Sequence, residues 1–215
     1  MYVDPSGYGR APGKQRADYA TGDTPQAVND AVNDVNVGDK NYGLCILNGT
    51  NSNDTSAIAI LKEIGLDGIW YKNQRPDFTP VSMFNVEIEN MSSNRQSAGG
   101  NYDQTRAAIA DKIIEANGNI NVLINNGVVD QYATAKTKKT VQSFLRSDDV
   151  QRILSSNVSN DLKKVALKQS IADFQSEKKY TIHEVDTKKT QLVPTEINGR
   201  FNHDGGVSDS KQCGK

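Results

Sequence analysis

The apolar residues of this chain come in short runs, and none approaches the roughly 18 residues that a membrane-spanning helix needs. The segment 1–9 also lacks the basic end and the apolar stretch of a signal peptide. A chain of 215 residues is nevertheless long enough to bury a core. We therefore expect a folded chain with generous loops, with no membrane-spanning segment, that is not an intact classically exported precursor.

The apolar patterns divide the chain into three parts. Residues 1–40 mix Gly, Pro, Asp, Asn and Ala with almost no periodicity, which predicts a leader or linker. Residues 41–176 combine strand-like and helix-like patterns, which predicts a mixed body. Residues 177–215 change character again and predict a compact unit of two strands and a short helix. The expected fold class is α+β, helix-rich, with a terminal ββα unit.

Individual elements follow from the same patterns. In the body we expect strands over 42–47, 84–88 and 120–124, and helices over 57–64, 102–116, 141–154 and 160–174. In the last part, strands over 180–183 and 191–193 flank a polar turn. Pro194 then opens a helix that runs to Arg200, since proline suits the first position of a helix.

Charge is distributed unevenly along the chain. Residues 1–135 hold 10 Lys and Arg against 16 Asp and Glu, whereas residues 136–215 hold 15 against 10, within a net charge of −1. A basic C-terminal part is expected of a chain that meets a polyanion such as nucleic acid. A solvated, lysine-rich helical surface would give the same pattern.

Both histidines of the chain, His183 and His203, fall within the terminal ββα unit. Carboxylates and amides surround them, including Glu184 and Asn198. Hydrolysis of a phosphodiester needs such a set, because a base must deprotonate water and a divalent cation must neutralise the charge that builds on the phosphate. Two surface histidines in a polar tail are the alternative. The two cysteines are too few and too distant for a disulfide framework or a cysteine zinc site.

The last part of the chain carries a resemblance to a known family. Tyr180-Thr-Ile-His-Glu-Val-Asp186, Thr190-Gln-Leu-Val-Pro194, Glu196-Ile197 and His203-Asp-Gly-Gly-Val207 follow one another in order. This segment is similar to the C-terminal signature of HNH (His-Me finger) nuclease toxins. An upstream block resembles the segment that precedes the signature in the same family; it comprises Asp67-Gly-Ile-Trp70, Arg75-Pro-Asp-Phe-Thr-Pro-Val81, Val86-Glu-Ile88, Met91, Arg95 and Asn101-Tyr102.

A second resemblance lies at the start of the chain. Met1-Tyr-Val-Asp-Pro-Ser-Gly-Tyr8 is similar to the junction that closes the Rhs or YD-repeat shell of polymorphic toxins. This resemblance implies a larger parent protein and a secretion machinery that exports the toxin. The chain would then act in the cytoplasm of a target cell.

The nuclease resemblance implies roles for single residues. His183 is the candidate base, and Glu184 and His203 are candidate metal ligands or supports; the roles of His183 and Glu184 exchange if the register shifts by one residue. Ile182 stands where the family has Trp, and Asn198 where it has a His ligand. An amide oxygen suits a hard cation such as Mg²⁺ better than Zn²⁺, so the substitution fits a Mg²⁺ site, a ligand recruited elsewhere or a weakened enzyme.

The function implied is that of a metal-dependent endonuclease toxin that cuts DNA in interbacterial competition. A cognate immunity protein would neutralise it, and the cofactor would be a divalent metal ion, Mg or Zn. The resemblance makes His183 and Glu184 catalytic candidates and His203, Asn198 and Glu184 metal candidates. We expect phosphate contacts from Lys188, Lys189, Arg200 and Lys211.

Two alternatives remain. The first is a catalytically degenerate HNH-like module that binds nucleic acid or a protein partner without cleavage, and the loss of two motif positions favours it. The second places the chemistry in the helical stretch 117–176, which is longer than the family pattern explains. Because that stretch contains no histidine, base catalysis there would need a carboxylate or a lysine.

Overall fold

The computed structural model describes residues 42–47, 52–72, 75–89 and 91–201. Over this part of the chain it is a mixed α+β fold with seven α-helices and two small antiparallel sheets. The helices are α2 (Ser52–Ile64), α3 (Asn101–Glu115), α4 (Ile120–Asn125), α5 (Ala135–Leu145), α6 (Asp148–Ser155), α7 (Asn160–Lys178) and α8 (Thr195–Arg200). None of the helices described is long and apolar enough to cross a membrane. The predicted α+β, helix-rich class is confirmed at this level.

The two sheets are built differently. The first joins β1 (Tyr42–Cys45), β2 (Ile69–Lys72) and β3 (Arg75–Pro76) in chain order, and a 3₁₀ turn, η2 (Thr79–Val81), follows it. The second has the order β4-β6-β5, from β4 (Asn85–Glu87), β5 (Tyr180–Glu184) and β6 (Lys189–Pro194). Strands β5 and β6 form a hairpin, and β6 pairs on its other side with β4. The terminal unit is therefore a β-hairpin followed by the short helix α8.

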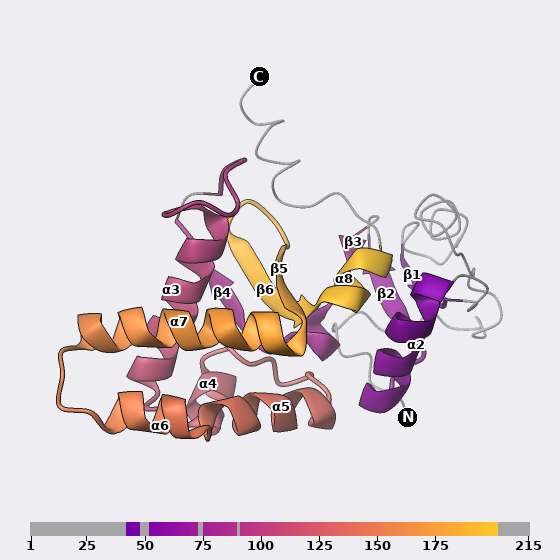
Figure 1. Cartoon of the computed structure of the whole chain (residues 1–215). Coiled ribbons are helices and arrows are strands. Elements are labelled where there is room, and N and C mark those ends of the chain that lie inside the picture. Colours follow the sequence, from indigo (N-terminus) through magenta and orange to yellow (C-terminus); the bar gives the residue numbers. More distant parts are fainter. Residues whose placement is uncertain (1–41, 48–51, 73–74, 90, 202–215) are drawn as a thin grey trace.

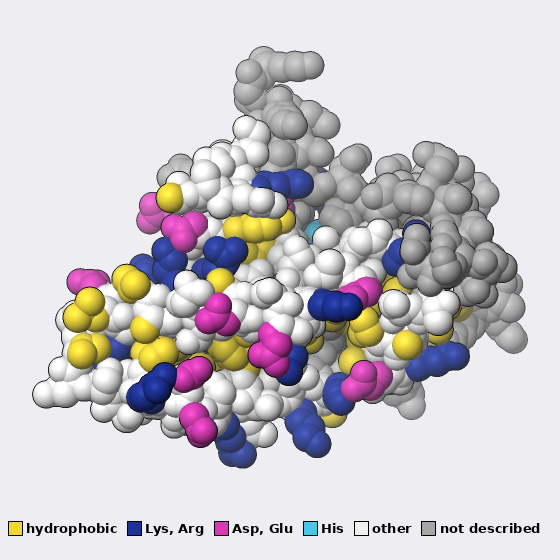
Figure 2. Space-filling model, viewed as in Figure 1, with side chains coloured by type: hydrophobic (Ala, Val, Ile, Leu, Met, Phe, Trp, Pro, Cys, Tyr) yellow, Lys and Arg dark blue, Asp and Glu magenta, His cyan; other side chains and the backbone are white. Residues whose placement is uncertain are grey.

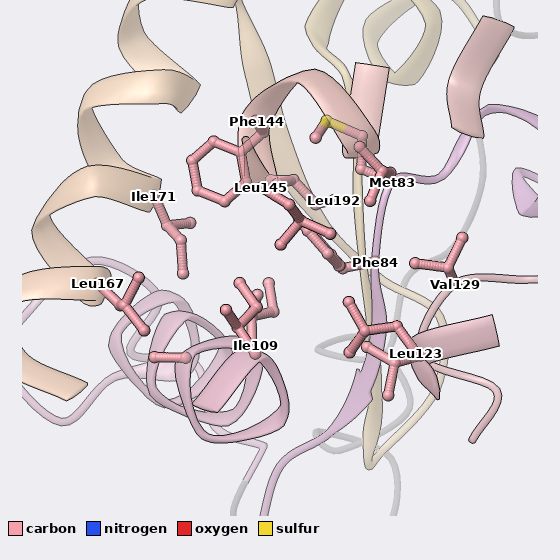
Figure 3. Packing of buried hydrophobic residues seen from close by; sticks show 14 of the residues in the cluster. Met83, Phe84, Ile109, Leu123, Val129, Phe144, Leu145, Leu167, Ile171 and Leu192 are labelled. Atoms are coloured by element: carbon pink, nitrogen blue, oxygen red, sulfur yellow. The ribbon is translucent and has the colours of Figure 1, made fainter. Parts of the chain in front are cut away.

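Two clusters of buried apolar side chains lie on either side of this second sheet. The larger cluster joins β4, β5 and β6 to α3, α4, α5, α6 and α7, and Figure 3 shows its centre around Phe84, Ile109, Phe144 and Leu192. The smaller cluster joins Phe78, Val193, Ile197 and Phe201 to α2 and β2. In Figure 1, α7 crosses in front of α3. Helix α2 and the first sheet lie on the right, on the side of α8 away from α7.

Side chains alternate between the two faces of a strand, so the hairpin divides its residues between these clusters. Ile182 and Leu192 are paired across the hairpin and belong to the larger cluster, whereas Val193 belongs to the smaller one. We call the side that carries Ile182, Glu184, Thr190 and Leu192 the α3 face. The side that carries His183, Gln191 and Val193 is the α8 face.

Several predicted elements are confirmed, and others are wrong. The strands at β1, β4, β5 and β6 and the helices at α2, α3 and α7 lie where their patterns predict. The strand predicted over 120–124 is helix α4, because the Asn119 side chain accepts a hydrogen bond from the Asn121 backbone N–H and caps a helix there. The single helix predicted over 141–154 is two, α5 and α6, because the chain leaves the helical conformation at Ser147.

The remaining predictions concern the start of the last helix, the stretch 117–176 and the leader. Pro194 ends β6 and precedes α8, with ψ near 133°, so that the helix begins one residue later than predicted. Stretch 117–176 supplies four helices and much of the larger cluster, including Leu123, Val141, Phe144 and Leu167. The leader predicted over residues 1–40 lies outside the described residues.

Candidate functional site

His183 occupies the α8 face of the hairpin. It pairs with Gln191 of β6, and its side chain is 4% exposed. The Phe78 ring and the imidazole pack in a T-shaped arrangement, with the ring centroids 4.8 Å apart and the planes at 83°. Phe78 belongs to the smaller apolar cluster, together with Ile197 and Phe201 at the α8 end of the chain. His183 is therefore not a surface histidine but a buried one, held beside α8.

Glu184 is the next residue along β5 and lies on the α3 face. Its Oε2 accepts a hydrogen bond from Arg95 Nε at 2.9 Å and lies 2.8 Å from Arg95 Nη2. Its Oε1 accepts from Asn101 Nδ2 at 2.7 Å. The Glu184 side chain is 4% exposed, so this carboxylate is buried with a charged donor, Arg95, on one oxygen and a neutral donor, Asn101, on the other.

The loop before α3 is shaped to deliver those donors. Asn101 also donates to the Ser92 carbonyl at 2.8 Å and accepts from the Ser92 N–H at 3.0 Å, which ties the loop to the helix start. A Cβ at Gly100 would lie 2.7 Å from the Asn94 carbonyl oxygen, so no side chain fits there without a shift. Arg95 and Asn101 lie in the upstream block of the resemblance, but the sequence assigned them no role.

Asn198 lies on α8, which contacts both β5 and β6. Its Oδ1 is buried and accepts no hydrogen bond, the one such case among the buried side-chain nitrogen and oxygen atoms of the described residues. An amide oxygen left bare in this way costs about 1–3 kcal/mol relative to a satisfied one. A bound cation, or a group that donates a hydrogen bond to this oxygen, would remove that cost.

The structure does not bring the residues predicted to hold a metal together: Asn198 lies on α8, Glu184 lies on the α3 face of β5, and His203 lies outside the described residues. Lys211, a predicted phosphate contact, also lies outside them. Within the described part of the chain, no three His, Cys, Asp or Glu side chains gather in a way that would hold a metal ion. The bare Asn198 oxygen fits a hard cation, whereas Glu184 lies on the opposite face of the sheet from His183 with both oxygens engaged.

The predicted phosphate-binding residues lie at two places. Lys188 and Lys189 are exposed at the β5–β6 turn, where both backbone N–H groups donate to Asp186 Oδ1 at 2.8 and 2.7 Å. This Asx-type turn holds the two lysines next to each other at one tip of the hairpin. Arg200 is half-buried in the last turn of α8.

A groove that the sequence did not predict runs along the second sheet. It has a volume of about 960 Å³ and is lined by residues of β4, β6, α3, the β3–η2 segment and the α4–α5 connection. Gln191, the cross-strand partner of His183, is one of them. No local sequence signal marks this groove, because its walls come from segments about 100 residues apart.

Figure 2 shows one face of the molecule, on which basic and acidic side chains are interspersed. Apolar side chains gather over the start of α7, where Leu162 and Val165 are exposed.

Comparison of the chain with protein-family models, with curated proteins and with solved structures found no match. The geometry of the site must therefore support any assignment of function.

Proposed function

We propose that this chain is a metal-dependent endonuclease of the HNH type that hydrolyses the phosphodiester bonds of DNA. The observation that carries the proposal is the buried, unpartnered Oδ1 of Asn198, on the helix packed against the strand that holds His183. A hairpin followed by a short helix is also the order of elements that the family resemblance implies.

In this proposal His183 takes a proton from the attacking water, since imidazole titrates near neutral pH. Lys188 and Lys189 contact phosphates next to the scissile bond, and Arg200 and Lys211 add further contacts. Asn198 and His203 would hold a divalent ion, Mg²⁺ or Zn²⁺, whereas Glu184, the other predicted ligand, is held on the opposite face of the sheet by Arg95 and Asn101. When bound, the ion would neutralise charge on the phosphate and the leaving oxygen.

The biological setting belongs to the same proposal. The nuclease would be the toxin of a larger Rhs-type parent, delivered by a secretion machinery into the cytoplasm of a competing cell. A cognate immunity protein would protect the producer. The start of the chain, which suggests this setting, lies outside the described residues.

Plasmid nicking tests the activity. We expect the purified chain to convert supercoiled plasmid to nicked and linear forms when Mg²⁺ or a transition metal is present. A chelator should stop this cleavage. Duplex RNA of matched length, assayed in parallel, shows which nucleic acid is cut. No cleavage above background with any common divalent metal would reject the nuclease.

Asn198→His tests directly whether the buried Asn198 side chain is a metal ligand. Imidazole is a stronger ligand than an amide for transition metals, so we expect tighter Zn²⁺ or Ni²⁺ binding by calorimetry and faster cleavage with those metals. Gln151→His, in α6, adds an imidazole outside the candidate site and serves as the control. If Asn198→His changes neither affinity nor rate, Asn198 is not a ligand.

A binding module without cleavage is the second candidate. The observations that favour it are the 4% exposure of His183 and the engagement of both Glu184 oxygens by Arg95 and Asn101. DNA affinity that is unchanged by chelator, with no cleavage by any metal, would support it over the nuclease.

The hairpin lysines test DNA binding in either case. Replacing Lys188 and Lys189 by Gln should flatten the slope of log affinity against log salt by up to about 0.9 for each phosphate that the protein no longer neutralises. Lys178→Gln with Lys179→Gln, at the other end of β5, is the matched control. An equal change in both double variants would mean that the hairpin turn makes no special contact with phosphate.

A further inference from the structure

The groove along the second sheet has a balanced set of charges. Its lining includes three cationic side chains, Arg75, Lys112 and Lys189, and three acidic ones, Asp77, Glu87 and Asp130. Two of the cations are already engaged, because Arg75 Nη1 donates to the Val185 carbonyl at 3.0 Å and Lys112 pairs with Glu115 at 2.7 Å. The groove is thus not built to attract a phosphate by charge, and it suits an uncharged polar group.

The neutral part of the lining supplies directed hydrogen-bonding groups. Gln191 Nε2 donates to Asn85 Oδ1 at 2.9 Å, and Asn85 Nδ2 donates to the Val128 carbonyl at 3.5 Å, so both amides are held in place. The second N–H of Gln191 and its Oε1 have no hydrogen-bond partner within the described part of the chain. A donor and an acceptor side by side match the polar edge of a nucleobase.

An exposed aromatic side chain completes the lining. Tyr132 lines the groove and is 43% exposed, so part of its side chain is open to a ligand there. Its backbone N–H donates to Asp130 Oδ1 at 2.8 Å, so the turn that carries it is fixed. Nucleic acid bases stack on such rings whatever their sequence.

We infer that this groove takes an unstacked base of single-stranded nucleic acid, with Tyr132 as the stacking platform and Gln191 reading the edge of the base. Its volume of about 960 Å³ lies within the range of small-ligand pockets. Lys189 lines the same groove at the hairpin tip and would meet the phosphate next to the inserted base. The inference rests on the proposed function and deepens it, because Gln191 pairs directly with His183.

A binding experiment without metal separates this inference from catalysis. Fluorescence anisotropy of the whole chain in chelator would use a labelled 12-nucleotide single strand, as DNA and as RNA, and a duplex of the same sequence. We expect the single strand to bind more tightly than the duplex. The comparison of the DNA and RNA strands shows which of the two supplies the base.

Variants of the tyrosine sharpen the test. Tyr132→Ala should weaken binding of the single strand about 5- to 150-fold, the effect of losing one stacked base, and leave duplex binding unchanged. Tyr132→Phe keeps the ring and should bind like the parent. Leu162→Ala removes an exposed apolar side chain outside the groove and is the control.

The outcomes distinguish the two proposals. Single-strand binding that depends on Tyr132, without cleavage by any metal, supports the groove and rejects the nuclease. Cleavage of duplex DNA that is indifferent to Tyr132, with no preference for single strands, rejects the groove and leaves the nuclease. Equal weakening of single strand and duplex by Tyr132→Ala also overturns the inference, because a stacked platform acts only on an open base.

Discussion

His183 and Glu184 are neighbours in β5, yet they lie in different surroundings on opposite faces of one sheet. On the α3 face, Glu184 is hydrogen-bonded by Arg95 and Asn101, and Thr190 is joined to Thr105 Oγ1 at 3.0 Å. On the α8 side, the amide oxygen of Asn198 is buried without a partner, and Gln191 opens into a groove. Polar groups that are matched within the protein hold its parts together, while groups with spare capacity are those that meet a ligand.

The largest expected effect comes from the α8 face. His183→Gln should lower the rate of DNA cleavage about 10²- to 10⁴-fold, the usual contribution of a general base. The loss of the T-shaped contact with Phe78 should by itself cost about 0.5–1.5 kcal/mol of stability. Single-turnover cleavage at equal folded fraction measures the first effect, and urea unfolding the second. A rate within twofold of the parent would remove His183 from the chemistry.

Substitutions in the apolar part of the α3 face should lower stability strongly and cleavage rate little. Leu192 is 1% exposed in the larger cluster, so Leu192→Ala should lower the free energy of unfolding by about 2–5 kcal/mol. Cleavage per folded molecule should stay close to that of the parent. Urea unfolding followed by circular dichroism gives the stability. A loss below about 1 kcal/mol would mean that this face is loosely packed.

A substitution of Glu184 tests whether this residue stabilises the fold on the α3 face or binds the metal. Glu184→Gln places an amide N–H₂ against Arg95 or Asn101, so we expect a loss of about 1–3 kcal/mol of stability. If the carboxylate only positions the loop before α3, metal affinity should not change. Calorimetric titration with Mn²⁺ decides this point. A loss of metal affinity without a loss of stability would return Glu184 to the metal site.

A small pH effect is expected in the first turn of α3. The Lys168 ammonium, which bonds to Asp103, holds the pKa of that carboxyl below its usual value. A lowered pKa contributes stability that is present above the unfolded value, near 3.8, and that is lost as the pH falls through the folded value. Asp103→Asn should therefore reduce the pH dependence of stability below about pH 4 by no more than about 1 kcal/mol. Thermal unfolding at pH 3 and 7 measures it, and Asp149→Asn is an exposed control.

The hairpin and its helix could be predicted from the sequence because their signals are local. The strand predicted over 180–183, the polar turn after it and the short helix ending at Arg200 are all present in the structure. The segment 120–124 shows the limit of such signals. A run of five residues has no measurable period, and the Asn119 cap decides in favour of a helix.

The sequence singles out residues of the candidate site but does not predict their geometry. The sequence identified His183 and Asn198, yet the burial of His183 depends on Phe78, about 100 residues away. The partners of Glu184 come from a loop about 90 residues earlier. Such pairings are set by the packing of β4 beside β6, and no local pattern carries that information.

The strand order β4-β6-β5 also has a consequence for how the chain acquires its structure. Val86 pairs with Thr190, so β4 has no strand partner until a segment 104 residues further along the chain has been made. Closing so long a loop is slow compared with forming α3 or α7, which need only local contacts. The sheet that holds His183 is thus expected to be among the last parts to form. On a ribosome, the chain would remain without its candidate site until nearly all of the described residues had been synthesised.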